Sequence, residues 1–148
     1  MVNYSMLTKQ LQAITENVDY PISNLANAAA LLWQELPDIN WAGFYLLVDQ
    51  KLILGPFQGK TACVEIPIGK GVCGTAVAES TTQLVPDVHR FPGHIACDGA
   101  SNSEIVIPLW KDDKIIAVMD IDSPIIGRFQ ENDRIELERF AKVLQVRL

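Results

Sequence analysis

Two pairs of strand-like segments place the strongest constraint on how this chain can fold. The first pair is Asn40–Val48 and Leu52–Leu54, and the second is Glu104–Trp110 and Lys114–Asp122. Each segment is rich in apolar and β-branched residues, and a few polar residues separate the members of a pair. This pattern is typical of β-hairpins. The sequence therefore predicts an antiparallel sheet.

Shorter elements lie between the two pairs. Gly55-Pro56 is expected to end the strand that begins at Leu52, because proline lacks the N–H that a ladder needs. Cys63–Ile66 is a candidate third strand, Val72–Glu79 a candidate short helix, and Gln83–Val85 a candidate brief strand.

Helical spacing of apolar residues marks both ends of the chain. Ser5 is the expected cap of a first helix, Pro21 interrupts the pattern, and Ser23 is the expected cap of a second helix. The buried stripe of the first helix is Leu7, Leu11, Ile14 and Val18. A last helix begins at about Glu131. We expect an α+β fold with a mostly antiparallel central sheet and the N- and C-terminal helices packed on one face.

The 148 residues fit a single domain, which we place at residues 1–148. The net charge is −6, and there is no cluster of Lys and Arg to neutralise phosphates, so we expect no nucleic-acid partner. No apolar run reaches the roughly 18–20 residues that cross a bilayer, so we expect no membrane partner. The first residues lack a basic start and an apolar core, and three cysteines are too few for a disulfide scaffold, so we expect a cytoplasmic protein.

The three cysteines stand at positions 63, 73 and 97. Cys73 opens the short helix, where the helix dipole is expected to lower the pKa of a thiol. Cys97 lies in a long polar loop, residues 86–102, and loops of this length are usually functional. Burial as a small apolar residue is the alternative, and it fits Cys63 and Cys73 better than Cys97.

Two other motifs are weak. His94 and Cys97 form one H-x2-C pair, but structural zinc sites usually show two tight pairs. Gly69, Gly71 and Gly74 match G-x-G-x-x-G, but no repeated βαβ pattern follows, so tight turns beside a small ligand are the better interpretation.

Three carboxyl groups form a candidate cluster with an aromatic neighbour. Asp120 and Asp122 are two apart on a strand and point to one face. With Glu104 they form either a sheet edge in water or a cluster that binds an ammonium group and retains a proton. Trp41 is either a core residue or the wall of a ligand site, where an S-methyl group would pack well.

The register of the second hairpin decides whether Glu104 joins this cluster. A two-residue turn at Asp112-Asp113 would pair Ile105 with Asp120 and place Glu104 on the opposite face. Glu104 can share a face with Asp120 only if the hairpin carries a bulge or a three-residue turn, or if Glu104 precedes the ladder.

The motifs together resemble one family. They are NWAGFYLL (40–47), GPFQGKTACVEIPIGKGVCG (55–74), VPDVHRFPGHIACD (85–98), SNSEIVIPL (101–109) and MDIDS (119–123). These stretches resemble the free methionine-R-sulfoxide reductases, which are small GAF-domain enzymes. The resemblance runs from about Tyr20 to the final helix, and it implies a GAF-like fold.

The resemblance also implies roles for the residues at the motif positions. The catalytic cysteine of the family falls on Cys97, its main resolving cysteine on Cys63, and its third motif cysteine on Cys73. The tryptophan that packs on the substrate methyl falls on Trp41. The family's site carboxylates fall on Glu104, Asp120 and Asp122.

The implied reaction is the reduction of free L-methionine-(R)-S-oxide. Cys97 would attack the substrate sulfur and become a sulfenic acid, and Cys63 would condense with it to a disulfide. Thioredoxin would then restore both thiols, and no cofactor is implied. Glu104 or Asp122 would donate the proton, and Asp120 would hold the substrate ammonium. A homodimer is implied as well. The alternatives are a GAF sensor that binds a small molecule without turnover and a redox-switch or zinc-binding regulator.

Overall fold

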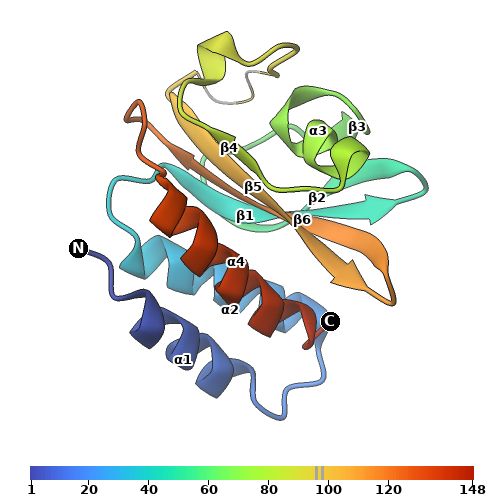
Figure 1. Cartoon of the computed structure of the whole chain (residues 1–148). Coiled ribbons are helices and arrows are strands. Elements are labelled where there is room, and N and C mark those ends of the chain that lie inside the picture. Colours follow the sequence, from blue (N-terminus) through green and yellow to red (C-terminus); the bar gives the residue numbers. More distant parts are fainter. Residues whose placement is uncertain (96, 98) are drawn as a thin grey trace.

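The computed structural model describes residues 1–95, 97 and 99–148, so that Ala96 and Asp98 of the long loop lie outside the described residues. Its centre is a six-stranded sheet in the order β3-β2-β1-β6-β5-β4, with every neighbouring pair antiparallel (Figure 1). The strands are β1 (Trp41–Val48), β2 (Lys51–Gly59), β3 (Glu65–Pro67), β4 (Gln83–Val85), β5 (Ser103–Lys111) and β6 (Lys114–Ser123).

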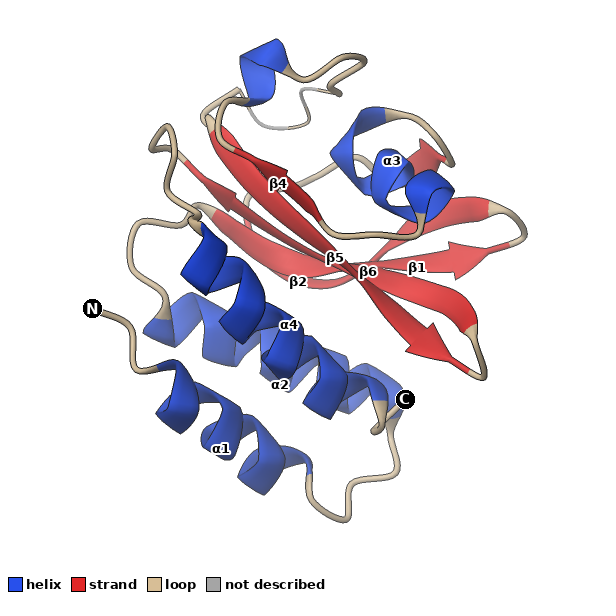
Figure 2. Cartoon of the chain, viewed as in Figure 1, coloured by secondary structure: helices blue, strands red, loops and turns tan. Residues whose placement is uncertain are grey.

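The helices lie on both faces of this sheet. On one face are α1 (Tyr4–Thr15), α2 (Pro21–Glu35) and α4 (Glu131–Gln145). On the other face are α3 (Gly71–Glu79) and a short 3-10 helix, η1 (Val88–Arg90), as Figure 2 shows. The expected α+β architecture, with the terminal helices on one face, is confirmed. None of the helices among the described residues is long and apolar enough to cross a membrane.

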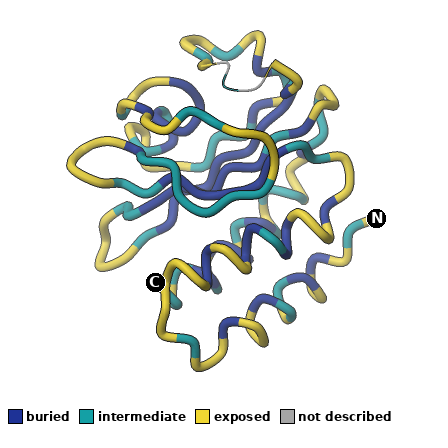
Figure 3. The backbone as a smooth tube through the Cα atoms, turned by 180° about the vertical axis from the view of Figure 1, so that it is seen from behind, coloured by how far each residue is buried: buried dark blue, intermediate teal, exposed yellow. Residues whose placement is uncertain are grey.

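Alternation along the central strands divides the core into two clusters. Phe44 and Met119 face the three terminal helices and belong to one cluster with Phe140. Tyr45 and Val118, each next to one of these residues in sequence, belong to the cluster on the α3 side. Figure 3 shows the central strands buried, while the helices alternate between buried and exposed positions.

The first two helices begin where we did not expect. Asn3, not Ser5, caps α1, and its side chain accepts a hydrogen bond from a first-turn backbone N–H at 3.0 Å. Pro21 is the first residue of α2 rather than an interruption, and Ser23 lies inside that helix. Proline is tolerated at this position because the N–H it lacks would have no partner in the helix. Ile14, expected in the buried stripe, is 40% exposed.

The second and third strands also differ from the prediction. β2 continues through Gly55-Pro56 instead of ending before it. The pairing of β1 with β2 shifts register at this point, and a bulge there accommodates a proline without a missing ladder bond. β3 begins at Glu65 rather than at Cys63, so Cys63 lies in the segment that precedes the strand.

Candidate active site

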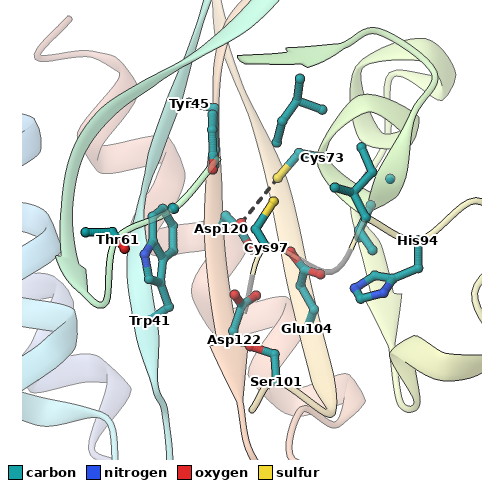
Figure 4. A pocket seen from close by; sticks show the side chains of 15 residues that line it. Trp41, Tyr45, Thr61, Cys73, His94, Cys97, Ser101, Glu104, Asp120 and Asp122 are labelled. Atoms are coloured by element: carbon teal, nitrogen blue, oxygen red, sulfur yellow. Dashed lines mark hydrogen bonds between the residues drawn. The ribbon is translucent and has the colours of Figure 1, made fainter. Parts of the chain in front are cut away.

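A cavity lies between the sheet and the layer that contains α3 and the long loop (Figure 4). Space open to the centre of a water molecule amounts to about 40 Å³, enough for about three ordered waters. The cavity brings together six of the seven residues that sequence reasoning selected, and the seventh, Cys63, is bonded to one of them. The six are Trp41, Cys73, Cys97, Glu104, Asp120 and Asp122.

The aromatic wall of the cavity comes from β1 and β2. The ring of Trp41 stacks with Tyr45 and with Phe57, at centroid distances of 5.9 and 5.2 Å. Its indole N–H donates to the backbone oxygen of Lys60 at 3.1 Å, which fixes the orientation of the ring. Trp41 is 3% exposed and contributes to the core, yet it also lines the cavity.

Sequence reasoning missed Tyr45. Its hydroxyl donates a 2.8 Å hydrogen bond to the backbone oxygen of Cys63, and it thereby ties the segment before β3 to the sheet. The signal was present in the sequence, because Tyr45 lies four residues after Trp41 on one strand and therefore points to the same face.

The three carboxyl groups share one face of β5 and β6. Glu104 pairs with Asp122, and Val106 pairs with Asp120. A register shift between Leu109 and Trp110 is the irregularity that the sequence required if Glu104 was to join the cluster. Of the three arrangements that would let Glu104 join the cluster, the bulge is the one found: the turn at Asp112-Asp113 has two residues, since Lys111 pairs with Lys114, but the ladder that follows is not regular.

Burial dominates the electrostatics of these carboxyl groups. Glu104 is 7% exposed and Asp120 is 5% exposed, so the cluster is not a sheet edge in water. Burial, together with the neighbouring Asp120 and Asp122, raises the pKa of Glu104 well above its ordinary value. The Oδ1 atom of Asp120 is buried and accepts no hydrogen bond from the described residues. The site therefore combines Glu104, whose pKa is raised and whose side chain hydrogen-bonds to Asp120 and Asp122, with a buried Asp120 oxygen that has no other donor among the described residues.

The three cysteines have different environments. Cys63 and Cys97 form a disulfide with their Cα atoms 5.6 Å apart. Cys73 is a buried free thiol whose Sγ donates to Oδ2 of Asp120 at 3.3 Å. Burial, then the charges of Asp120 and Glu104, raise the pKa of Cys73 well above its ordinary value. Our expectation that the α3 dipole lowers this pKa was wrong, because desolvation and like charges outweigh the helix terminus.

The loop that carries Cys97 is fastened at several points. The N–H of Gly71, in the first turn of α3, donates to the backbone oxygen of Gly93 at 3.2 Å. Ile95 packs over Gly71 so closely that an added Cβ would lie 3.2 Å from its Cγ1. At the other end of the loop, the N–H of Asn102 donates to the backbone oxygen of Ser123 at 2.8 Å. These contacts hold the loop over the cavity.

The disulfide also bears on the zinc hypothesis. That hypothesis took His94 and Cys97 as ligands, with Cys63 and Cys73 as further possible ligands, and the sulfurs of Cys63 and Cys97 are bonded to each other here. A different trio, Cys73, Glu104 and Asp120, has ligand atoms within 4.8 Å of one another. Cys73 and Asp120 are already joined by a hydrogen bond there, and the trio is part of the cavity described above.

Comparison with known proteins places the chain in a family. Residues 23–146 match the model of the GAF domain. The free methionine-R-sulfoxide reductase of Escherichia coli is 54% identical over 142 residues, which cover 96% of this chain and 86% of that protein. This chain belongs to the free methionine-R-sulfoxide reductases.

Solved structures of the family agree closely with this fold. The fRMsr of Staphylococcus aureus in its reduced form has a TM-score of 0.98 at 57% identity, with 100% of this chain and 96% of that chain covered. The complex of that protein with its substrate has a TM-score of 0.96 at 56% identity, with 100% and 97% covered. The resemblance identified from the motifs is therefore confirmed over the whole length of the chain.

Proposed function

We propose that this chain catalyses the thiol-dependent reduction of free L-methionine-(R)-S-oxide to L-methionine. The observation that carries the proposal is the Cys63–Cys97 disulfide at a cavity that also holds buried carboxyl groups. A disulfide beside such a cavity is the expected oxidised product of a cysteine that attacks a substrate there. The substrate-bound relative from Staphylococcus aureus supports a small ligand in a fold of this kind.

The first step transfers the sulfoxide oxygen to Cys97. The Cys97 sulfur attacks the substrate sulfur, and the substrate oxygen takes a proton from a carboxyl group. Methionine leaves, and Cys97 becomes a sulfenic acid. Glu104 is our choice as proton donor over Asp122, because burial and its acidic neighbours raise the pKa of Glu104 well above its ordinary value, which favours the protonated form.

The second step closes the disulfide. The thiol of Cys63 attacks the sulfenic acid of Cys97, forming the sulfur–sulfur bond and releasing water. An external dithiol then reduces the disulfide by exchange, and we propose thioredoxin as that reductant. We also propose that the enzyme is a cytoplasmic homodimer and that it needs no cofactor. The overall reaction converts one sulfoxide and one dithiol to methionine, a disulfide and water.

Selectivity for the free amino acid follows from the carboxylates. The buried Oδ1 of Asp120 lacks a donor, and the ammonium group of a free amino acid can supply one. A peptide-bound residue has no such ammonium and would leave this oxygen unpaired, which costs about 1–3 kcal/mol. Trp41 offers its flat face to the S-methyl group.

Turnover separates this proposal from a GAF sensor. The reduced protein is incubated with racemic methionine sulfoxide and dithiothreitol, and free methionine is measured by chromatography. We expect consumption to stop near half, because one sulfoxide epimer is accepted. Cys97→Ser should lose turnover, whereas Cys63→Ser should complete one round in a single-turnover experiment and recycle poorly with thioredoxin.

Two outcomes would count against the proposal. Binding of the sulfoxide without any methionine would identify a sensor, and full activity of Cys97→Ser would remove the assigned nucleophile. N-acetyl methionine sulfoxide serves as the matched substrate without an ammonium group. Its reduction at a comparable rate would rule out the role given to Asp120.

A further inference from the structure

The two histidines of the chain have opposite surroundings. His89, in η1, pairs through Nε2 with Oδ1 of Asn102 at 2.8 Å and helps to fasten the base of the loop. His94 lines the cavity, and its ring takes part in no hydrogen bond among the described residues. The proposed mechanism uses neither residue. An imidazole without a partner on a ligand cavity is available to a ligand.

His94 and Trp41 lie on opposite sides of the cavity. In Figure 4 the imidazole points toward Glu104, on the side of the cavity away from Trp41, and the sulfur of Cys97 lies between the two rings. Among the described residues that line the cavity there is no lysine and no arginine. His94 is therefore the one side chain in that lining that can carry a positive charge.

We infer that His94 binds the α-carboxylate of the substrate and thereby sets its orientation in the cavity. The inference rests on the proposed function and deepens it. In methionine sulfoxide the ammonium and carboxylate groups share one carbon, and the S-methyl group is at the other end of the molecule. With the methyl group on Trp41 and the sulfoxide at Cys97 and Glu104, the amino-acid end extends toward the side of the cavity where His94 lies.

Other donors in the lining are less suited to a carboxylate. Ser101 accepts a 3.1 Å hydrogen bond from Asn40 and lies beside Asp122 in the close-up, where a second negative charge is repelled. Thr61 lies at the end of the cavity that Trp41 occupies. His94 faces Glu104, which carries no charge while it keeps its proton.

The electrostatics of His94 agree with this role. Burial and the neighbouring His89 lower the pKa of His94, while the charge of Asp120 raises it. The imidazole is thus largely neutral in the empty cavity and offers one N–H donor. A carboxylate placed against it favours the charged imidazolium, so binding strengthens the contact that the substrate makes.

The test compares two ligands that differ only in the carboxylate. They are L-methionine-(R)-S-oxide and the amine 3-(methylsulfinyl)propan-1-amine, which keeps the sulfoxide and the ammonium group. Dissociation constants are measured by calorimetry in a Cys97→Ser background, which can neither turn over nor form the disulfide. The variants are His94→Ala and His94→Asn, and each is checked for an unchanged melting temperature.

We expect His94→Ala to weaken binding of the amino acid by about 10-fold or more, as for a hydrogen bond to a charged group. Binding of the amine should change less than twofold, and His94→Asn should recover part of the loss. The KM of the amino acid in the Cys97 enzyme should rise in parallel with little change in kcat.

Two results would overturn the inference. One is an equal loss for both ligands, which would mean that His94 only shapes the loop. The other is unchanged binding of the amino acid. Neither result touches the proposed function, which is judged from methionine release by the unsubstituted protein. If that protein releases no methionine but binding still depends on His94 and on the carboxylate, the inference stands and the enzymatic proposal fails.

Discussion

The two faces of the sheet are built from the same strands but carry different kinds of side chain. On the helical face, Phe44 and Met119 are fully buried in one apolar cluster with residues of α2 and α4, which pack on the sheet, while α1 packs on these two helices. On the α3 face, other side chains of the central strands, among them Trp41, Glu104 and Asp120, line the cavity. The first face contains apolar contacts that stabilise the fold, and the second contains buried ionisable groups that cost stability.

The difference shows how one small domain separates stability from chemistry. Apolar burial on the helical face contributes about 25 cal/mol per Å² removed from water. A buried carboxyl group resists ionisation, and it keeps a proton that it would lose in water. The fold tolerates the Asp120 Oδ1 atom without a hydrogen-bond donor because apolar packing on the opposite face stabilises the domain, and a bound ligand can donate a hydrogen bond to this atom.

Truncation on the helical face should have the largest effect on stability. Phe140 is 0% exposed and belongs to the helical cluster, so Phe140→Ala should lower the free energy of unfolding by roughly 3–5 kcal/mol. Urea unfolding at 15 °C measures this loss. The fraction that remains folded should reduce methionine sulfoxide at an unchanged kcat, and a lost kcat with intact folding would show that the two faces are not independent.

Glu104→Gln should have the opposite profile, with a loss of activity of roughly 100-fold as expected for a general acid and a gain in stability. The native pKa of Glu104 lies above its ordinary value of 4.5, so the native state holds a proton that the unfolded chain releases as the pH rises. The free energy of unfolding of the parent protein therefore falls as the pH rises above 4.5. Glutamine removes this contribution.

The measurement is urea unfolding of both proteins at several pH values from 5 to 8. The stability advantage of Glu104→Gln should grow with pH. The matched control is Glu65→Gln, since Glu65 forms an exposed ion pair with Lys51 at 3.0 Å and should show no comparable trend. A constant difference between Glu104→Gln and the parent would mean that Glu104 is ionised throughout this range.

A surface substitution on the helical face should have the smallest effect. Arg139 pairs with Glu136 along α4 at 2.7 Å, and its side chain is 67% exposed. Solvent screens such pairs, so Arg139→Ala should change the free energy of unfolding by less than about 0.5 kcal/mol and leave kcat unchanged. A larger loss would place part of the stability of this face outside its apolar cluster.

Much of the fold was predictable because it depends on local pattern. The strand β1, the second hairpin and the last helix were predicted with nearly correct bounds, since alternation and helical spacing act over a few residues. The starts of α1 and α2 were predicted wrongly. Near the start of α1, more than one polar residue could serve as the cap, and Pro21 can either interrupt a helix or occupy its first position. The end of β2 was missed because a bulge accommodates Pro56.

For the candidate site, too, some features were predictable from the sequence and others were not. By itself, the sequence singled out the side chains that we propose carry the chemistry: three cysteines, Trp41, and the carboxyl groups of Glu104, Asp120 and Asp122. Only the tertiary structure decided that a bulge turns Glu104 toward Asp122 and that burial raises the pKa of Cys73 instead of lowering it. The physical reason is that register and desolvation depend on segments far apart in the chain, whereas the identity of a nucleophile or an acid is local.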